Sequence, residues 1–110
     1  AAAREGRGGA PADALAPLLD AVALDARRGE AALPPGVACA AKTGTMNFVR
    51  GLGGYLTAAS GRRYAFALFS EDLARRAALP DPAAPGVSRG WLSRARRLER
   101  AILRDWAGAL

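Results

Sequence analysis

The residues best suited to chemistry lie together at Lys42-Thr43-Gly44-Thr45. Among 16 cationic side chains, Lys42 is the one lysine, and a lysine ammonium is compact, mobile and open to pKa shifts on burial. In an extended segment Thr43 and Thr45 point to the same side, because strand side chains alternate. Gly44 has no Cβ, so a ligand chain can come close to the backbone there. Two hydroxyls and an ammonium suit the binding of a carboxylate.

The rest of the composition excludes several kinds of active site. The chain has no histidine, so neither Ser-His-Asp nor Cys-His chemistry can be completed from it. Its single cysteine, Cys39, excludes an internal disulfide and a cysteine-based zinc site. We interpret Cys39 as a small core side chain rather than a nucleophile. No metal and no cofactor are expected, and no apolar run approaches the roughly 20 residues of a membrane span.

The formal net charge of the chain is +6 at pH 7. Almost all of the cations are arginines, beside abundant alanine and 13 glycines. A GC-rich coding sequence would produce the same bias, so the charge is weak evidence for nucleic-acid binding. Nucleic acid is therefore not an expected partner.

Three short strands are expected in the middle of the chain, at residues 37–43, 51–58 and 63–70. Residues 59–62 fit a tight hairpin between the last two. The segment 42–45 then lies at the end of the first strand. Glycines in the second strand indicate a close approach of another backbone or of a helix, since they would weaken an isolated strand.

Helical patterns flank these strands. Apolar spacing predicts a helix over residues 13–28 and a short helical piece near 72–79. A final helix is expected from a cap at Ser88 to about Ala107. Its apolar stripe consists of Trp91, Ala95, Leu98, Ile102 and Trp106, with most arginines on the other face. The expected fold class is α+β: an antiparallel sheet of about three strands with a packed C-terminal helix.

The tetrapeptide also belongs to a longer pattern. K-T-G occurs with S-x-x-K and S-x-N elements in penicillin-binding proteins and β-lactamases. Residues 40–70 resemble the C-terminal part of the serine D-alanyl-D-alanine carboxypeptidases and endopeptidases, the class C low-molecular-mass penicillin-binding proteins of peptidase family S13. In that family the K-T-G strand is followed by a V-x-x-L-x-G-Y strand, a G-R-R/K hairpin and an A-F-A strand. The matching segments here are 49–55, 61–63 and 65–67.

The resemblance implies roles for individual residues. The catalytic candidates are Lys42, which would supply positive potential, and Thr45, whose N–H would be an oxyanion-hole donor. The substrate-binding candidates are Thr43, Gly44, Thr45 and Arg50. Arg50 has two interpretations: a second cation for the substrate carboxylate, or a solvated arginine at a strand end, which is the simpler one. Tyr55 is interpreted as sheet packing rather than as a general acid.

The nucleophile of the family is missing from this sequence. The third residue after Ser60, Ser70, Ser88 and Ser93 is never lysine, and no S-x-N triplet occurs. We therefore expect residues 13–110 to be the C-terminal part of a larger penicillin-binding or β-lactamase-like α/β/α domain, after a flexible lead at 1–12. The missing N-terminal part of the same enzyme is an expected partner, and the fragment alone should be inactive.

The implied function is hydrolysis of peptidoglycan stem peptides through an acyl-enzyme, with β-lactams as acylating inhibitors. Such an enzyme works in the periplasm or otherwise outside the cytoplasmic membrane. A β-lactamase shares K-T-G, and a degenerate homologue could keep the fold without catalysis. The alternative from another class is a non-catalytic binding module, which uses the Arg-rich C-terminal helix on nucleic acid or an anionic surface.

Overall fold

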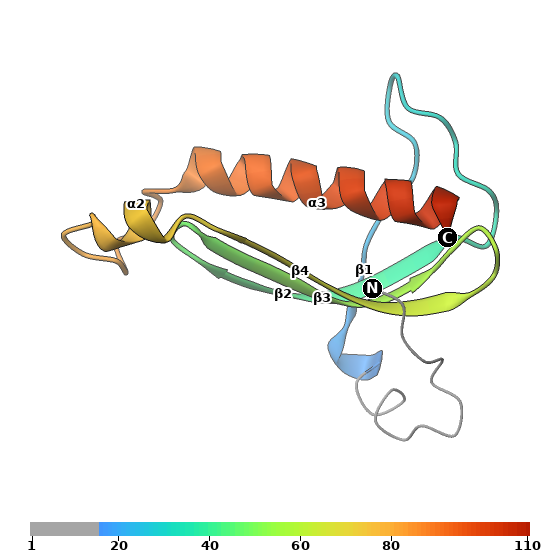
Figure 1. The fold of residues 1–110 in the computed structure, drawn as a ribbon, viewed down its shortest axis with the longest axis horizontal. Helices are drawn as coiled ribbons and strands as arrows, with labels where there is room; N and C mark the ends of the chain where they lie inside the picture. The colour runs from blue at the N-terminus through green and yellow to red at the C-terminus, as the bar shows by residue number, and fades with distance from the viewer. Residues whose placement is uncertain (1–15) are drawn as a thin grey trace.

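The computed structural model describes residues 16–110, which form a single sheet with one long helix across it (Figure 1). The flexible lead expected at residues 1–12 lies outside the described residues. In chain order the elements are η1 (Ala16–Leu18), β1 (Asp20–Ala21), β2 (Ala38–Met46), β3 (Val49–Thr57), β4 (Arg63–Glu71), α2 (Leu73–Ala77) and α3 (Arg89–Ala109).

The sheet is antiparallel throughout, with the strand order β1-β2-β3-β4. The α+β fold with a packed C-terminal helix is confirmed, and the fourth strand is the two-residue β1. Both β2 and β3 extend further than expected toward the turn that joins them. β2 continues to Met46 and β3 begins at Val49, so the segment 42–45 lies inside a strand rather than at its end.

One face of the sheet carries the core, and α3 lies across it (Figure 1). The buried cluster joins the sheet to the helix, and Trp106 packs beside it with its ring edge-on to Phe66 at 6.5 Å between centroids. Its members are Leu24, Cys39, Ala41, Leu52, Leu56, Phe66, Leu103 and Ala107.

The buried stripe of α3 differs from the expected one. Its buried residues are Ala95, Glu99, Leu103 and Ala107, spaced four apart. Leu98, expected in the stripe, is 56% exposed. The stripe is rotated because Glu99 has a cationic partner on the sheet, which makes burial of a carboxylate possible.

The helix expected over residues 13–28 is wrong for the part that the structure describes. Only the three-residue η1 is helical there, and Val22 donates its N–H to the Cys39 carbonyl at 2.8 Å. The backbone is therefore used to extend the sheet at β1, while Leu24 is 6% exposed in the core. Pairing and packing with the rest of the chain override the helical spacing of the apolar residues.

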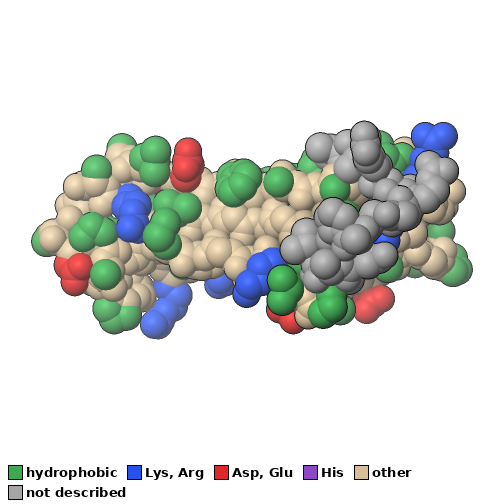
Figure 2. Space-filling model, turned by 90° about the horizontal axis from the view of Figure 1, so that it is seen from below, with side chains coloured by type: hydrophobic (Ala, Val, Ile, Leu, Met, Phe, Trp, Pro, Cys, Tyr) green, Lys and Arg blue, Asp and Glu red, His purple; other side chains and the backbone are tan. Residues whose placement is uncertain are grey.

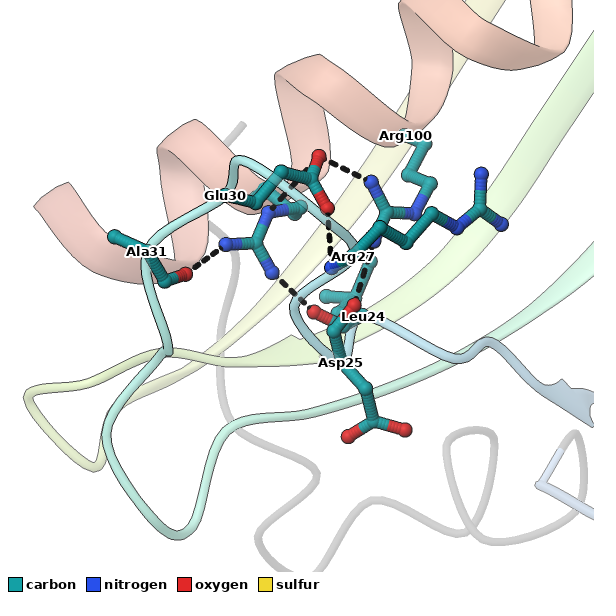
Figure 3. Close-up of polar contacts among 7 residues, drawn as sticks. Leu24, Asp25, Arg27, Glu30, Ala31 and Arg100 are labelled. Carbon is teal, nitrogen blue, oxygen red and sulfur yellow. Dashed lines mark hydrogen bonds and ion pairs between the residues drawn. The ribbon is translucent and has the colours of Figure 1, made fainter.

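The loop that follows β1 is held against α3 by two arginines (Figure 3). Arg100 bonds Glu30 and the Asp25 carbonyl. Arg104 donates to the carbonyls of Leu24 and Ala31, and its Nε is 3.7 Å from a Glu30 oxygen. Most arginines of this helix were expected on the face away from the apolar stripe, and these two bind the loop.

Between residues 16 and 110, no helix is both long and apolar enough to cross a membrane.

Candidate active site

The segment Lys42-Thr43-Gly44-Thr45 lies exposed in the second half of β2. The first half of the strand is covered on its outer edge by β1, which pairs with Ala40 and Ala41. Past Ala41, no described strand pairs with that edge. The four residues therefore form an open edge of the sheet.

The backbone N–H and C=O groups of alternate residues point outward from this open edge. The Cys39 carbonyl accepts a hydrogen bond from the N–H of Val22, the residue after β1, so the N–H and C=O of Cys39 face outward, away from β3. Backbone groups alternate along an antiparallel strand, so those of Thr43 and Thr45 also face outward. These groups can pair with an extended peptide laid beside β2.

The side chains of the edge point to both faces of the sheet. Thr43 and Thr45 lie opposite the buried Leu52 and Arg50, on the α3 side, as expected for residues two apart. Lys42 lies opposite Gly53 and so belongs to the other face. An edge-bound ligand would therefore meet the hydroxyls from one side and the ammonium from the other.

The long helix α3 lies on the opposite face of the sheet, and Figure 2 shows the face that carries Lys42. By the register, Gly44, Gly51 and Gly53 belong to this face and add no side chain to it. Lys42 borders two shallow hollows of about 310 and 260 Å³. Phe69, 79% exposed, lines the second of them. A Cβ on Gly44 would meet nothing within 4 Å, so the described residues leave the space above it open.

Arg50 is buried, so its interpretation as a solvated strand-end residue is wrong. Its side chain is 11% exposed, and its Nε lies 2.8 and 2.9 Å from the two carboxylate oxygens of Glu99. Its Nη1 donates to Thr45 Oγ1 at 3.3 Å. Sequence reasoning missed Glu99 at this site. The available signal was its position four residues from both Ala95 and Leu103, on the buried side of α3.

The turn that follows Thr45 is unusually constrained. Asn47 and Phe48 connect β2 to β3, and Phe48 has a φ of 58°, which is rare for a bulky residue. The ring is nevertheless 5% exposed, edge-on to Trp91 at 5.9 Å and under the Arg75 guanidinium at 4.7 Å. Packing of the ring holds the backbone in this conformation.

Ser88 also serves this turn. It occupies the N-cap position of α3, but its side chain makes no cap hydrogen bond. Its hydroxyl donates to Asn47 Oδ1 at 3.0 Å and accepts from the Phe48 N–H at 3.2 Å. The Asn47 amide donates in turn to the Pro82 and Ala84 carbonyls. The start of α3 and the loop before it thus fix the end of the strand that carries Thr45.

The surroundings of two other candidates, Cys39 and Tyr55, indicate roles in packing. Cys39 is buried, and desolvation raises its thiol pKa to about 11, which opposes a nucleophilic role at neutral pH. Tyr55 is half-buried on the sheet, with the Arg63 guanidinium 4.5 Å from its ring centre.

The cationic surface of α3 is smaller than its sequence suggests. Arg100 and Arg104 bind the 24–31 loop, and the exposed arginines of the helix are Arg89, Arg94, Arg96 and Arg97. Elsewhere, residues 16–110 contain no group of three or more His, Cys, Asp or Glu side chains arranged for a metal ion.

A comparison with known protein families matches most of the described chain. Residues 23–90 match the family model described as the D-Ala-D-Ala carboxypeptidase 3 (S13) family. The match includes the loop before β2 and the elements β2, β3, β4 and α2. No curated protein and no solved structure matches the chain.

Proposed function

Because the chain belongs to the D-Ala-D-Ala carboxypeptidase 3 (S13) family, we propose that it supplies the substrate-binding edge of a serine peptidase that acts on peptidoglycan. The family-level function is that of a D-Ala-D-Ala carboxypeptidase, a hydrolase of cell-wall peptides. The finer proposal is that β2 binds the stem peptide and helps to stabilise its acylation. The observation that carries it is the open outer edge at Thr43 and Thr45.

Binding would occur by extension of the sheet. An extended peptide beside β2 would exchange main-chain hydrogen bonds with Thr43 and Thr45. Both hydroxyls lie on the α3 side of that edge, where they would hold the terminal D-Ala carboxylate. The open space above Gly44 supports a close approach of the acyl chain.

Catalysis would use two groups of the same strand. The Thr45 N–H would donate to the oxyanion of the tetrahedral intermediate, an interaction worth about 3 kcal/mol in comparable hydrolases. Lys42 would raise the positive potential at the carboxylate and at the proton relay from the opposite face. An acyl-enzyme would form on a serine, whose hydroxyl proton a second lysine would accept.

That serine and second lysine would lie on sequence outside these 110 residues, since no S-x-x-K occurs among them. The face with Lys42 and its two hollows would then be the side on which the missing part of the enzyme packs. Action on peptidoglycan implies a site outside the cytoplasmic membrane.

The test is acylation of the complete gene product by a labelled penicillin. We expect one label per chain on a serine outside this segment, and hydrolysis of a D-Ala-D-Ala peptide. Lys42→Met should reduce the acylation rate at least 100-fold, because it removes the ammonium and keeps the side-chain length. Arg62→Met, at an exposed cation in the hairpin at the far end of β3, should leave it unchanged.

Absence of labelling in the folded complete protein would reject this function and favour a degenerate homologue. Labelling followed by rapid release of hydrolysed penicillin, without peptide cleavage, would instead identify a β-lactamase.

A further inference from the structure

Glu99 is a carboxylate where an apolar residue would be expected. It is 4% exposed, on the face of α3 that packs on the sheet, four residues from Ala95 and four from Leu103. Burial of an ion pair costs desolvation energy on both partners, and apolar replacements of similar volume are often no less stable. The stability of the fold therefore gives little reason for an acid at this position.

The contacts of Glu99 lead to the candidate site. Its two oxygens hold the Arg50 Nε at 2.8 and 2.9 Å. The same guanidinium donates from Nη1 to Thr45 Oγ1 at 3.3 Å. Three elements, α3, β3 and β2, are thus joined by one chain of polar contacts that ends at a hydroxyl on the open edge.

This arrangement constrains the Thr45 hydroxyl. A hydroxyl has one proton to donate and lone pairs that accept. Because Arg50 occupies a lone pair, the proton of Thr45 is free for another acceptor, and the cationic donor polarises the O–H bond. An oriented, polarised hydroxyl is a better donor to a carboxylate than one that rotates freely.

We propose that Glu99 is a positioning residue for recognition of the substrate carboxylate, acting through Arg50 on Thr45. The proposal rests on the proposed function and adds a specific role for α3. Glu99 also offsets the charge of Arg50, so Arg50 orients the hydroxyl rather than binding the substrate as a free cation.

The experiment measures carboxylate preference in the complete protein. The second-order acylation constant is determined by mass spectrometry for benzylpenicillin and for its methyl ester. The readout is the constant for benzylpenicillin divided by the constant for the ester. Glu99→Gln should lower this ratio about tenfold, the loss expected for one charge-assisted hydrogen bond. General damage to the fold would lower both constants and leave the ratio unchanged. Asp105→Asn, which removes an exposed carboxylate from the same helix, should also leave the ratio unchanged.

A second variant protects the test against misfolding. Arg50→Met combined with Glu99→Met removes both charges together, keeps similar volumes and should lower the ratio to the same extent. An unchanged ratio in either folded variant would overturn the role of Glu99. A raised ratio in Glu99→Gln would also overturn it, since Arg50 would then bind the carboxylate directly once released. If the unaltered protein is not acylated by penicillin at all, the proposed function itself fails and the inference with it.

Discussion

Glu30 and Arg100 are 70 residues apart in the sequence, yet Glu30 Oε2 and Arg100 Nη1 meet at 2.5 Å (Figure 3). Glu30 Oε1 also accepts the Arg27 N–H at 2.8 Å. The loop between β1 and β2 has little regular structure of its own. Its position against α3 therefore depends on these contacts and on those of Arg104.

The ion pair at Glu30 predicts a specific acid sensitivity. The hydrogen bond from Arg100, followed by that from the Arg27 N–H, lowers the Glu30 pKa from 4.5 to about 2. A carboxyl with a lower pKa in the folded state stabilises the fold above its unfolded pKa, and this contribution disappears as the pH falls toward the folded value. We expect the melting temperature of the complete protein to fall between pH 4.5 and 2, and to fall less in Glu30→Gln. The control is Glu71→Gln, at an exposed carboxylate on β4; if Glu30→Gln and the unaltered protein lose stability in parallel, the prediction is wrong.

Gly54 should be the least replaceable glycine of the sheet. A Cβ at Gly54 would lie 2.0 Å from the Ala40 carbonyl oxygen and 2.7 Å from the Ala41 Cα. Both are backbone atoms of β2, so the strands would have to separate. Gly54→Ala should lower the free energy of unfolding by about 3 kcal/mol, measured by urea denaturation. A loss below about 1 kcal/mol would contradict the close approach.

Gly44→Ala is the counterpart of Gly54→Ala that tests ligand binding rather than stability. Its Cβ would meet no described atom within 4 Å, so the urea midpoint should stay unchanged. If the acyl chain passes over this residue, acylation by penicillin should slow about tenfold or more, since an added methyl would occupy its path. An unchanged acylation rate would place the ligand elsewhere on the edge.

Ser88 should stabilise the turn after Thr45 more than the helix it precedes. Ser88→Ala removes the hydrogen bond that the hydroxyl accepts from the Phe48 N–H and the one that it donates to Asn47 Oδ1. Ser88 is 2% exposed, so water cannot easily replace either bond. We expect a loss of about 2 kcal/mol in unfolding free energy. Ser93→Ala is the control, because it removes a half-buried hydroxyl from the same helix, away from the turn. Hydrogen exchange of the Phe48 amide should accelerate in Ser88→Ala alone.

Phe48 gives a test of backbone strain. Its φ of 58° costs about 1 kcal/mol for a residue with a Cβ, whereas loss of the buried ring costs about 3–5 kcal/mol. Both Phe48→Ala and Phe48→Gly should therefore destabilise the protein. The glycine variant should be the more stable of the two by about 1 kcal/mol, the reverse of their usual order. The usual order, with alanine more stable, would argue against the positive φ.

Local patterns in the sequence predicted the three longer strands, but neither β1 nor the contacts between distant residues. Alternation and the hairpin at residues 59–62 predicted β3 and β4 well, and the spacing of Thr43 and Thr45 predicted that they share a face. The turn at Asn47 and Phe48 was missed because φ > 0 is normally signalled by glycine at the second position. Here the ring contacts with Trp91 and Arg75 replace that signal.

The remaining errors concern partners distant in the sequence. Arg50 and Glu99 are 49 residues apart, and neither residue's neighbours indicate that the two meet. The helix expected at residues 13–28 failed for a related reason: Val22 pairs with Cys39 and Leu24 packs in the core, which the helical spacing of apolar residues did not reveal.

The unpaired half of β2 has a consequence for the protein in solution. Main-chain groups that suit an incoming peptide equally suit the same strand of a second molecule, and open sheet edges are templates for aggregation. Along Lys42 to Met46 the ammonium of Lys42 is the one charged side chain that opposes such pairing. A peptide or penicillin seated on the edge would block this self-association, so the protein should tolerate higher concentrations with a ligand bound than without one.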